Sequence, residues 1–141
     1  MILPDVNVLL YAFRRDTPDH AAYRTWLESV VNGEMAYGMS PQVLSGVLRV
    51  ATHPRIFRKP SQISEVLDFT SVLLNQPHCQ VVQPGARHWT IFQDLCQRAS
   101  VTGNLVQDAW FAALSIESGC EWITVDRHFA RFEGLRWRPP L

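Results

Sequence analysis

Three aspartates stand where carboxylates could act together. Asp5 lies between residues 1–3, expected to form a strand, and residues 6–13, expected to form a helix. Asp126 follows the strand-like stretch "CEWITV", and Asp108 lies in the expected first turn of the helix "NLVQDAWFAALSIESG". Ligand sites of open α/β sheets lie outside the carboxyl ends of the strands, so the three acids are expected at one edge. Converging carboxylates repel one another and raise a pKa, a conflict that a divalent cation removes.

Each acid also has a simpler local interpretation. Asp5 can cap the helix that follows it, Asp126 can cap the short helix "RHFARF", and Asp108 can be a stabilising first-turn acid. For any one acid the local role is the commoner case, but the placement of all three favours a metal site. Asn7 and Thr124 are expected to hydrogen-bond a carboxylate or a metal-bound water, or else to be ordinary turn and strand residues.

The elements that must position these acids alternate along the chain. Strands are expected at residues 1–3 and in "EMAYGM", "CQVVQ" and "CEWITV", with helices between them. Helix caps are expected at Thr17, Ser40 and Asn104. The pattern predicts one α/β domain over residues 1–141 with a largely parallel sheet.

Two helices show a clear apolar face. The helix "SQISEVLDFTSVLLNQP" is expected to turn its apolar side chains inward, namely Ile63, Val66, Leu67, Leu73 and Leu74. The helix that carries Asp108 is expected to pack on the core through Ala109, Ala112, Ala113 and Ile116. The apolar excess on the early helices can form a groove for a partner helix or a dimer contact.

Composition narrows the class of protein. The chain has 141 residues, of which 47% are hydrophobic, so it can build a real core and disorder is not expected. Lysine plus arginine equals aspartate plus glutamate at 13 each, so nucleic-acid binding must come from a local patch. Cys79, Cys96 and Cys120 form no disulfide or metal pattern, and neither a leader nor a membrane span is visible. We therefore expect a reduced cytoplasmic protein.

The motifs resemble those of a known family. "PDVNVLLYAF" is similar to the opening D-x-N motif of the PIN-domain ribonucleases, among them the VapC toxins of toxin-antitoxin pairs. "NLVQDAWFAALSIESG" resembles their D-x-x-x-A-A-x-A helix, and "ITVDRHFARFEGLRW" their terminal D-R-x-F-x-x-F motif. The resemblance implies a three-layer α/β/α sandwich and a Mg²⁺- or Mn²⁺-dependent endoribonuclease. Asp5, Asp108 and Asp126 would be its catalytic and metal-binding residues. It also implies a VapB-like antitoxin partner and a homodimer.

One family residue is missing. The family commonly has a glutamate on the helix "SPQVLSGVLRVATHPRIF", where this chain has Gly46 beside Ser45. No carboxylate lies between Pro41 and Lys59, so one tightly held ion is expected. A second ion could arrive with the RNA and use a phosphate oxygen as a ligand.

The expected reaction is hydrolysis of a phosphodiester. The ion would lower the pKa of a bound water and neutralise charge in the transition state, and Asp126 would accept the proton. RNA contacts are expected from Arg49, Arg55, Arg58 and Lys59, although a solvated loop is an equal alternative. A second basic set can bind RNA or an acidic antitoxin tail, namely Arg127, Arg131, Arg136 and Arg138.

Other functions remain open from the sequence. The alternative is a catalytically weakened PIN-like module that binds RNA or metal without cutting. An aspartyl-phosphate phosphatase would need a second aspartate in its D-x-D motif, where this chain has Asn7. A purely structural domain predicts no effect of divalent ions on thermal stability.

Overall fold

The computed structural model describes all of residues 1–141. The strands are β1 (Ile2–Pro4), β2 (Tyr37–Met39), β3 (Cys79–Val81), β4 (Glu121–Ile123) and β5 (Trp137–Arg138). The helices are α1 (Val6–Phe13), α2 (His20–Val31), α3 (Pro41–Ala51), α4 (Ile63–Leu74), α5 (His88–Arg98), α6 (Asn104–Ser118) and the short 3₁₀ helix η1 (Arg127–Arg131). The predicted alternation of strands and helices is confirmed, and only β5 had no sequence signal.

The sheet is parallel throughout. β1 pairs with β4, with Ile2 opposite Glu121, and β4 pairs with β5. β2 pairs with β3 as a separate hydrogen-bonded ladder. The two ladders meet at Gly38 of β2, where an added Cβ would lie 3.3 Å from the Ile2 carbonyl oxygen. The same Cβ would lie 2.9 Å from Val82 Cγ2, so glycine allows the close approach of β2 to β1.

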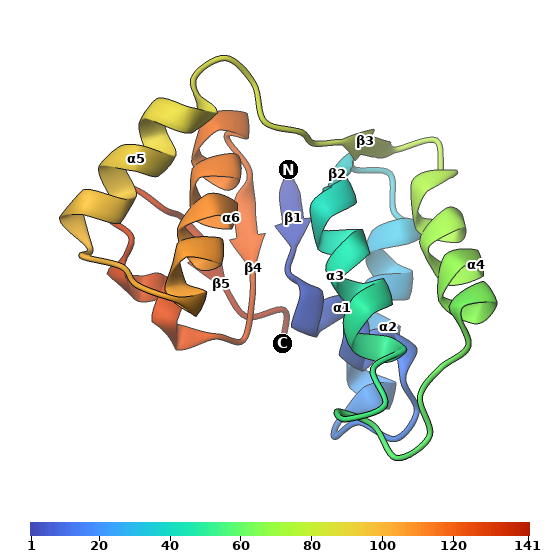
Figure 1. The fold of residues 1–141 in the computed structure, drawn as a ribbon. Helices are drawn as coiled ribbons and strands as arrows, with labels where there is room; N and C mark the ends of the chain where they lie inside the picture. Colours follow the sequence, from blue (N-terminus) through green and yellow to red (C-terminus); the bar gives the residue numbers. More distant parts are fainter.

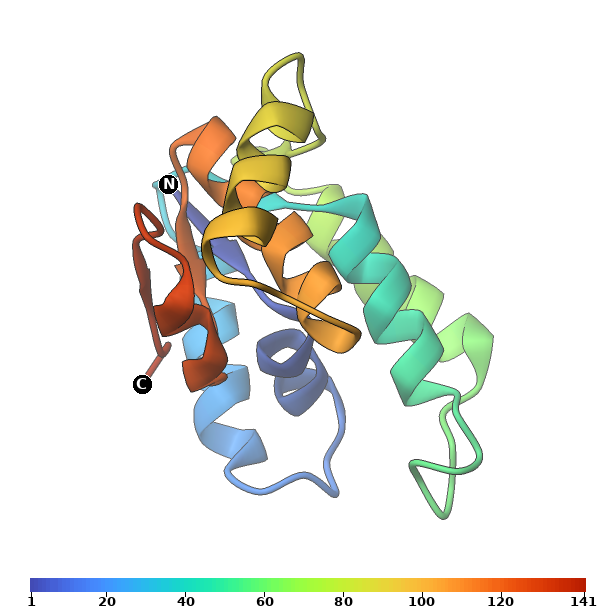
Figure 2. The ribbon, with the colours of Figure 1, turned by 60° about the vertical axis from the view of Figure 1, so that its left-hand side comes forward.

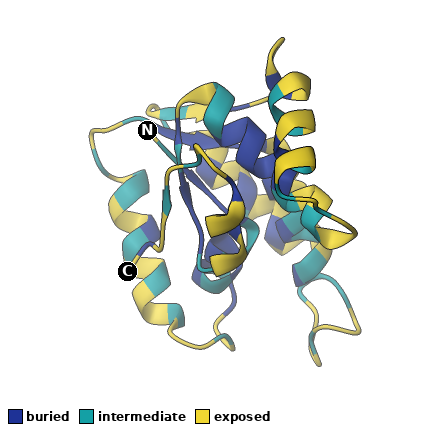
Figure 3. Cartoon of the chain, turned by 90° about the vertical axis from the view of Figure 1, so that its left-hand side faces the viewer, coloured by how far each residue is buried: buried dark blue, intermediate teal, exposed yellow.

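Helices cover the strands on both sides. Figure 1 shows α5 and α6 on one side of β1 and β4, with α1, α2, α3 and α4 on the other. Figure 2 brings α5 and α6 forward, where they lie side by side across the strands. Buried residues gather on the strands and on the helix surfaces facing them, while exposed residues occupy the outer surfaces (Figure 3). The α/β fold class predicted from the sequence is confirmed.

The tight core follows from small side chains on α6. Ala109, Ala112 and Ala113 are fully buried, as predicted, and they let α6 approach the sheet closely. Ile116 is only half-buried. Trp122 of β4 is also fully buried and stacks on Phe111 of α6.

The predicted inward face of α4 is partly wrong. Val66 and Leu73 are buried, but Ile63, Leu67 and Leu74 are exposed. α4 lies at the outside of the molecule (Figure 1) and packs mainly on α3. A helix with one packed side buries only a narrow stripe of residues three or four apart, so the flanking apolar side chains reach solvent.

One of the three predicted caps is confirmed. The Ser40 hydroxyl accepts the Val43 N–H at 3.3 Å and starts α3. Thr17 is not a cap: its hydroxyl donates to the Arg14 carbonyl oxygen at 2.7 Å, and α2 begins only at His20. Asn104 is the first residue of α6 rather than its cap, since the cap position is Gly103.

Two further expectations concern the whole chain. All three cysteines are free thiols. No helix combines the length and the apolar character needed to cross a membrane.

Candidate active site

Asp5 joins the end of β1 to the start of α1. Its backbone N–H donates to the Ile123 carbonyl oxygen at 2.9 Å, which fixes it to the end of β4. Its Oδ1 accepts the Val6 N–H at 2.6 Å and thereby caps α1. Its Oδ2 accepts the Thr124 hydroxyl at 2.6 Å. The local capping role is therefore real, and it holds the carboxylate rigidly at the sheet edge.

The Asp5 carboxylate has no cationic partner. Its side chain is buried at 6% exposure, and no lysine, arginine or histidine forms an ion pair with it. Burial raises its pKa to about 6, and the hydrogen bonds from Thr124 and Val6 oppose that rise. The negative charges of Asp108 and Asp126 raise the pKa further. The three acids thus lie close enough to repel one another, as their placement at the strand ends predicts.

Thr124 connects Asp5 to Asp126. The fully buried Thr124 hydroxyl donates to Asp5 and accepts the Asp126 N–H at 3.1 Å. Asp126 caps η1, because its Oδ1 accepts the His128 N–H at 2.8 Å. His128 Nδ1 also lies 3.0 Å from this oxygen. Sequence reasoning did not single out His128, whose only signal is its position two residues after an aspartate.

Asp108 faces the same site from α6. It lies one turn inside the helix, so the expectation of a first-turn acid is wrong. Burial raises its pKa, and the charge of Asp126 adds to the rise. His128 and Arg131 partly offset it. Arg131 of η1 therefore lies near these acids.

Asn7 and Gly46 flank this arrangement. Asn7 is half-buried in the first turn of α1, and its side chain makes no hydrogen bond within the chain. Gly46 lies against Val6, the residue after Asp5: a Cβ added to Gly46 would lie 2.8 Å from Val6 Cγ2. A larger side chain at position 46 therefore needs Val6 to move. Close packing of α3 on α1 occupies the place where the family commonly has a glutamate.

The donors at this edge suit a hard divalent cation. The three carboxylates provide oxygen ligands, which favour Mg²⁺ or Mn²⁺ over zinc. A cation would also supply the positive charge that buried Asp5 lacks. The structure nevertheless contains no group of three His, Cys, Asp or Glu side chains arranged to hold a metal ion. Waters or substrate oxygens must then complete any ligand set, as is usual for magnesium.

The basic residues fall into two groups. The first group is exposed and forms no ion pair, namely Arg49, Arg55, Arg58 and Lys59. In the second group, Arg136 donates to the Gly119 carbonyl oxygen at 2.7 Å and Arg138 pairs with Glu121 at 2.8 Å. These two arginines anchor the last strand, so the second group is only partly free for a partner.

A groove lies between the end of α1, α2 and α4. Its volume is about 840 Å³. Its lining includes apolar side chains of all three helices, namely Ala12, Phe13, Leu27, Val31, Phe69, Val72 and Leu73. Charged residues also line it, among them Arg24 and Glu28, which form an exposed ion pair at 2.8 Å. The apolar excess noted on the early helices thus borders an open groove.

Fold and site together define the class of protein. A short parallel sheet between helices, with carboxylates at the carboxyl ends of β1 and β4, is the arrangement of an α/β protein that binds its ligands at the sheet edge. Residues 2–135 match the PIN domain. The chain belongs to the PIN-domain family and, within it, to the VapC proteins.

Known relatives cover the whole chain. Ribonuclease VapC43 of Mycobacterium tuberculosis is 40% identical over 141 residues, covering 100% of this chain and 96% of the relative. Ribonuclease VapC25 of the same organism is 37% identical over 142 residues, with 100% of both chains covered.

Solved structures support the fold. The structure of VapBC2 from Rickettsia felis bound to a promoter DNA fragment matches with a TM-score of 0.71 at 19% identity, covering 99% of this chain and 98% of the other. VapBC-1 from nontypeable Haemophilus influenzae matches with a TM-score of 0.70 at 17% identity and the same coverage. These structures confirm the fold, and the match to the PIN domain together with the 40% identical relative confirms the predicted family.

Proposed function

We propose that this protein is a Mg²⁺- or Mn²⁺-dependent endoribonuclease, the toxin of a VapBC-type toxin-antitoxin pair. The observation that carries the proposal is the buried Asp5 carboxylate, which has no cationic partner and is repelled by Asp108 and Asp126 at the same sheet edge. Relatives named VapC ribonucleases over the full chain support RNA as the substrate.

Asp5, Asp108 and Asp126 are the residues that would hold the ion. When bound, the ion neutralises charge on the phosphodiester and lowers the pKa of a water molecule. Thr124 keeps Asp5 in place through a 2.6 Å hydrogen bond, so this carboxylate loses little freedom on binding. Asn7, with an amide that is unpaired within the chain, is available to bind a water or a carboxylate at the site.

Proton transfer is assigned to Asp126. One of its oxygens is engaged by His128, whereas Oδ2 accepts no hydrogen bond within the chain. A half-exposed carboxylate with one free oxygen can take a proton from the attacking water. The neighbouring Arg131 lies on the same short helix as His128 and adds positive charge beside the RNA phosphate.

The substrate is held by its backbone. Arg49, Arg55, Arg58 and Lys59 are exposed and carry four positive charges that no acid neutralises. Phosphate contacts fix the position of a nucleic acid without reading its sequence. RNA affinity is therefore expected to fall steeply with salt concentration.

A VapB-like antitoxin is the proposed partner, in the reduced cytoplasm. Solved neighbours are VapBC pairs, which supports a partner of this type. The groove between α1, α2 and α4 offers an apolar floor and charged walls, which suit an amphipathic antitoxin segment. We also propose a homodimer, as the family resemblance implies.

A binding module that does not cut RNA is the second candidate. It is favoured by Gly46 in place of the family glutamate and by the lack of a ready-made group of three metal ligands. A chain with only part of the ligand set could bind RNA, or an ion, without accelerating hydrolysis.

Cleavage of a single-stranded RNA by the purified chain separates the two candidates. The wild type is expected to cleave in Mg²⁺ and to stop when EDTA is added. Asp5→Asn and Asp126→Asn are expected to lose at least about 100-fold in rate, the usual range for a group that acts on charge or protons. Asp94→Asn is the matched control, because Asp94 is an exposed acid paired with Arg98 on α5. RNA binding without cleavage would support the second candidate, and full activity in Asp5→Asn would overturn the first.

A further inference from the structure

Arg14 is a buried cation away from the acidic site. It ends α1, and its side chain is only 7% exposed. Its Nε and Nη2 donate to the two oxygens of Asp16 at 2.9 and 2.6 Å. Nη1 donates to the Ser61 hydroxyl, and Nη2 also donates to the Lys59 carbonyl oxygen, both at 3.0 Å. The guanidinium also lies 3.7 Å from the centre of the Phe57 ring.

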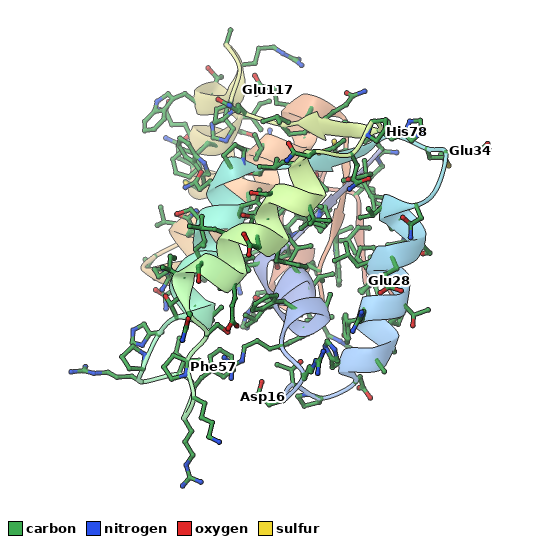
Figure 4. The ribbon with its side chains drawn as sticks, turned by 90° about the vertical axis from the view of Figure 1, so that its right-hand side faces the viewer. Asp16, Glu28, Glu34, Phe57, His78 and Glu117 are labelled. Atoms are coloured by element: carbon green, nitrogen blue, oxygen red, sulfur yellow. The ribbon has the colours of Figure 1, made fainter.

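These contacts join two connections that are distant in the sequence. Asp16 belongs to the connection between α1 and α2, whereas Phe57, Lys59 and Ser61 belong to residues 52–62 between α3 and α4, here called the basic loop. Figure 4 shows Asp16 and Phe57 at the same end of the molecule. Only a planar guanidinium can bind a carboxylate with two donors while it also stacks on a ring.

The basic loop is compact at its base and charged at its tip. The Ser61 N–H donates to the Ala51 carbonyl oxygen at 2.8 Å and closes the loop. Arg55, Arg58 and Lys59 are exposed and have no acidic partner. Long side chains extend from this region into solvent (Figure 4). The loop therefore displays three free cations from a fixed base.

The helices α1 and α3 connect the basic loop to the acidic site. Gly46 of α3 packs on Val6, directly after Asp5, and α3 continues for five residues to Ala51, a rise of about 8 Å. α1 connects Asp5 at its N-cap to Arg14 at its C-cap, nine residues later and a rise of about 14 Å. α3 thus leads into the basic loop and α1 ends at Arg14, which contacts it, so the loop lies at the ends of both helices away from Asp5, within reach of an RNA strand that crosses the acidic site.

We propose that Arg14 is a positioning residue that fixes the basic loop as an arm that binds RNA phosphates. This inference rests on the proposed ribonuclease function. Arg14 itself does not touch the RNA, since its guanidinium is occupied by Asp16, Ser61, Lys59 and Phe57. Its effect is to hold three cations in one arrangement, so that the loop need not be ordered when RNA binds.

The test is a double-mutant cycle on RNA binding. All proteins carry Asp5→Asn, so that the RNA stays intact, and a fluorescent single-stranded RNA reports the dissociation constant at several salt concentrations. Arg14→Lys keeps the positive charge but removes the planar guanidinium that donates to both oxygens of Asp16. It is made both in the chain with the native loop and in a chain with a neutral loop, in which Arg55, Arg58 and Lys59 are changed to Gln. Arg98→Lys is the matched control, since Arg98 is exposed and pairs with Asp94 on α5. Amide exchange of residues 52–62 is measured in parallel.

Arg14→Lys is expected to weaken RNA binding about tenfold and to reduce the slope of log K against log salt by about 0.7 for each phosphate that the loop no longer binds. In the neutral-loop protein the same change is expected to have almost no effect, because the loop no longer carries charge to position. Amide exchange in the basic loop is expected to accelerate in Arg14→Lys and not in Arg98→Lys. Ser61→Ala removes one hydrogen-bond partner of the Arg14 guanidinium and is also expected to weaken RNA binding and to accelerate amide exchange in the basic loop. It replaces Arg14→Lys in the cycle if that variant does not fold.

Equal weakening in both backgrounds, or no weakening in a folded Arg14→Lys protein, would overturn the inference. This outcome is distinct from failure of the proposed function. A wild-type chain that binds RNA with the expected cycle but never cleaves it would overturn the nuclease and leave the role of Arg14. If the Arg14→Lys protein cleaves RNA normally at an unchanged KM, the role of Arg14 is overturned and the nuclease function is kept. A wild-type chain that does not bind RNA at all would overturn both hypotheses.

Discussion

Asp5→Asn is expected to stabilise the metal-free protein at neutral pH although Asp5 belongs to the proposed active site. Burial raises the pKa of Asp5 from its ordinary value of 3.8 to about 6. Between these values the native state binds more protons than the unfolded state, so the free energy of unfolding falls as pH rises. Well above pH 6, where Asp5 is ionised in both states, the cost of burying its charge is complete. For a rise in pKa from 3.8 to about 6, this cost is about 3 kcal/mol. Asparagine carries no charge, so Asp5→Asn avoids the cost of burying an ionised carboxylate.

The substitution also has a local cost. Both Asp5 oxygens accept hydrogen bonds, from Val6 and from Thr124, whereas an asparagine offers only one acceptor oxygen. Loss of one hydrogen bond costs about 1 kcal/mol. The net expectation is a gain of about 2 kcal/mol above pH 7 and a loss of about 1 kcal/mol near pH 4, where Asp5 is largely protonated in the native state.

Urea denaturation in EDTA, above pH 7 and near pH 4, measures the change in the free energy of unfolding that Asp5→Asn causes at each pH. Asp16→Asn is the control with the opposite sign. The pKa of Asp16 is lowered, chiefly by its hydrogen bond from Arg14, so its contribution to stability is present at neutral pH and is lost as pH falls through the native pKa. Added Mg²⁺ is expected to stabilise the wild type and not Asp5→Asn. If Asp5→Asn destabilised the protein equally at both pH values, the reasoning from buried charge would be refuted.

Three further changes test packing and hydrogen bonds, two beside the site and one in the core between β2 and α4. Thr124→Val removes the donor to Asp5 and should cost about 2 kcal/mol above pH 7 and less near pH 4, as measured by urea denaturation at both values. Gly46→Ala should lower stability by about 1 kcal/mol in thermal unfolding, because the clash with the stiff side chain of Val6 outweighs the better helix propensity of alanine; a more stable Gly46→Ala protein would contradict this packing. Tyr37→Phe removes a buried hydroxyl that donates to a carbonyl of α4 at 2.7 Å and should cost about 1 kcal/mol at every pH below 9, and a change in that cost with pH would contradict it.

Much of the fold could be predicted because its signals are local. Ser40 before Pro41 marks the start of α3, and Gly119 ends α6 in the left-handed conformation at φ 73°. All the expected strands form, although β2 begins at Tyr37, three residues after the start of the predicted stretch "EMAYGM". The wrong cap at Thr17 arises because a neighbour competes for its side chain: the Thr17 hydroxyl donates to the Arg14 carbonyl oxygen at the end of α1, and α2 begins only at His20.

The candidate site could be predicted in part for the same reason. An aspartate directly after a strand must lie at the sheet edge, which places Asp5 and Asp126 without knowledge of the fold. The buried position of Arg14 gave no such signal, because two of its partners, Lys59 and Ser61, lie 45 and 47 residues away in the chain. The positive charge of Arg131 near Asp108 was equally hidden, since it depends on how η1 packs beside α6.

By itself, the sequence determined the order of the strands and helices other than β5, the parallel α/β class and the chain positions of the acids, since these depend on periodicity, caps and strand ends. The tertiary structure alone decided which groups share an environment. In the folded chain, Thr124 hydrogen-bonds both Asp5 and Asp126, and no cationic side chain pairs with Asp5. Val6 packs against Gly46 and leaves no room for a side chain there. The physical reason is that burial, charge coupling and steric contact depend on distances between segments far apart in the chain, which local pattern does not encode.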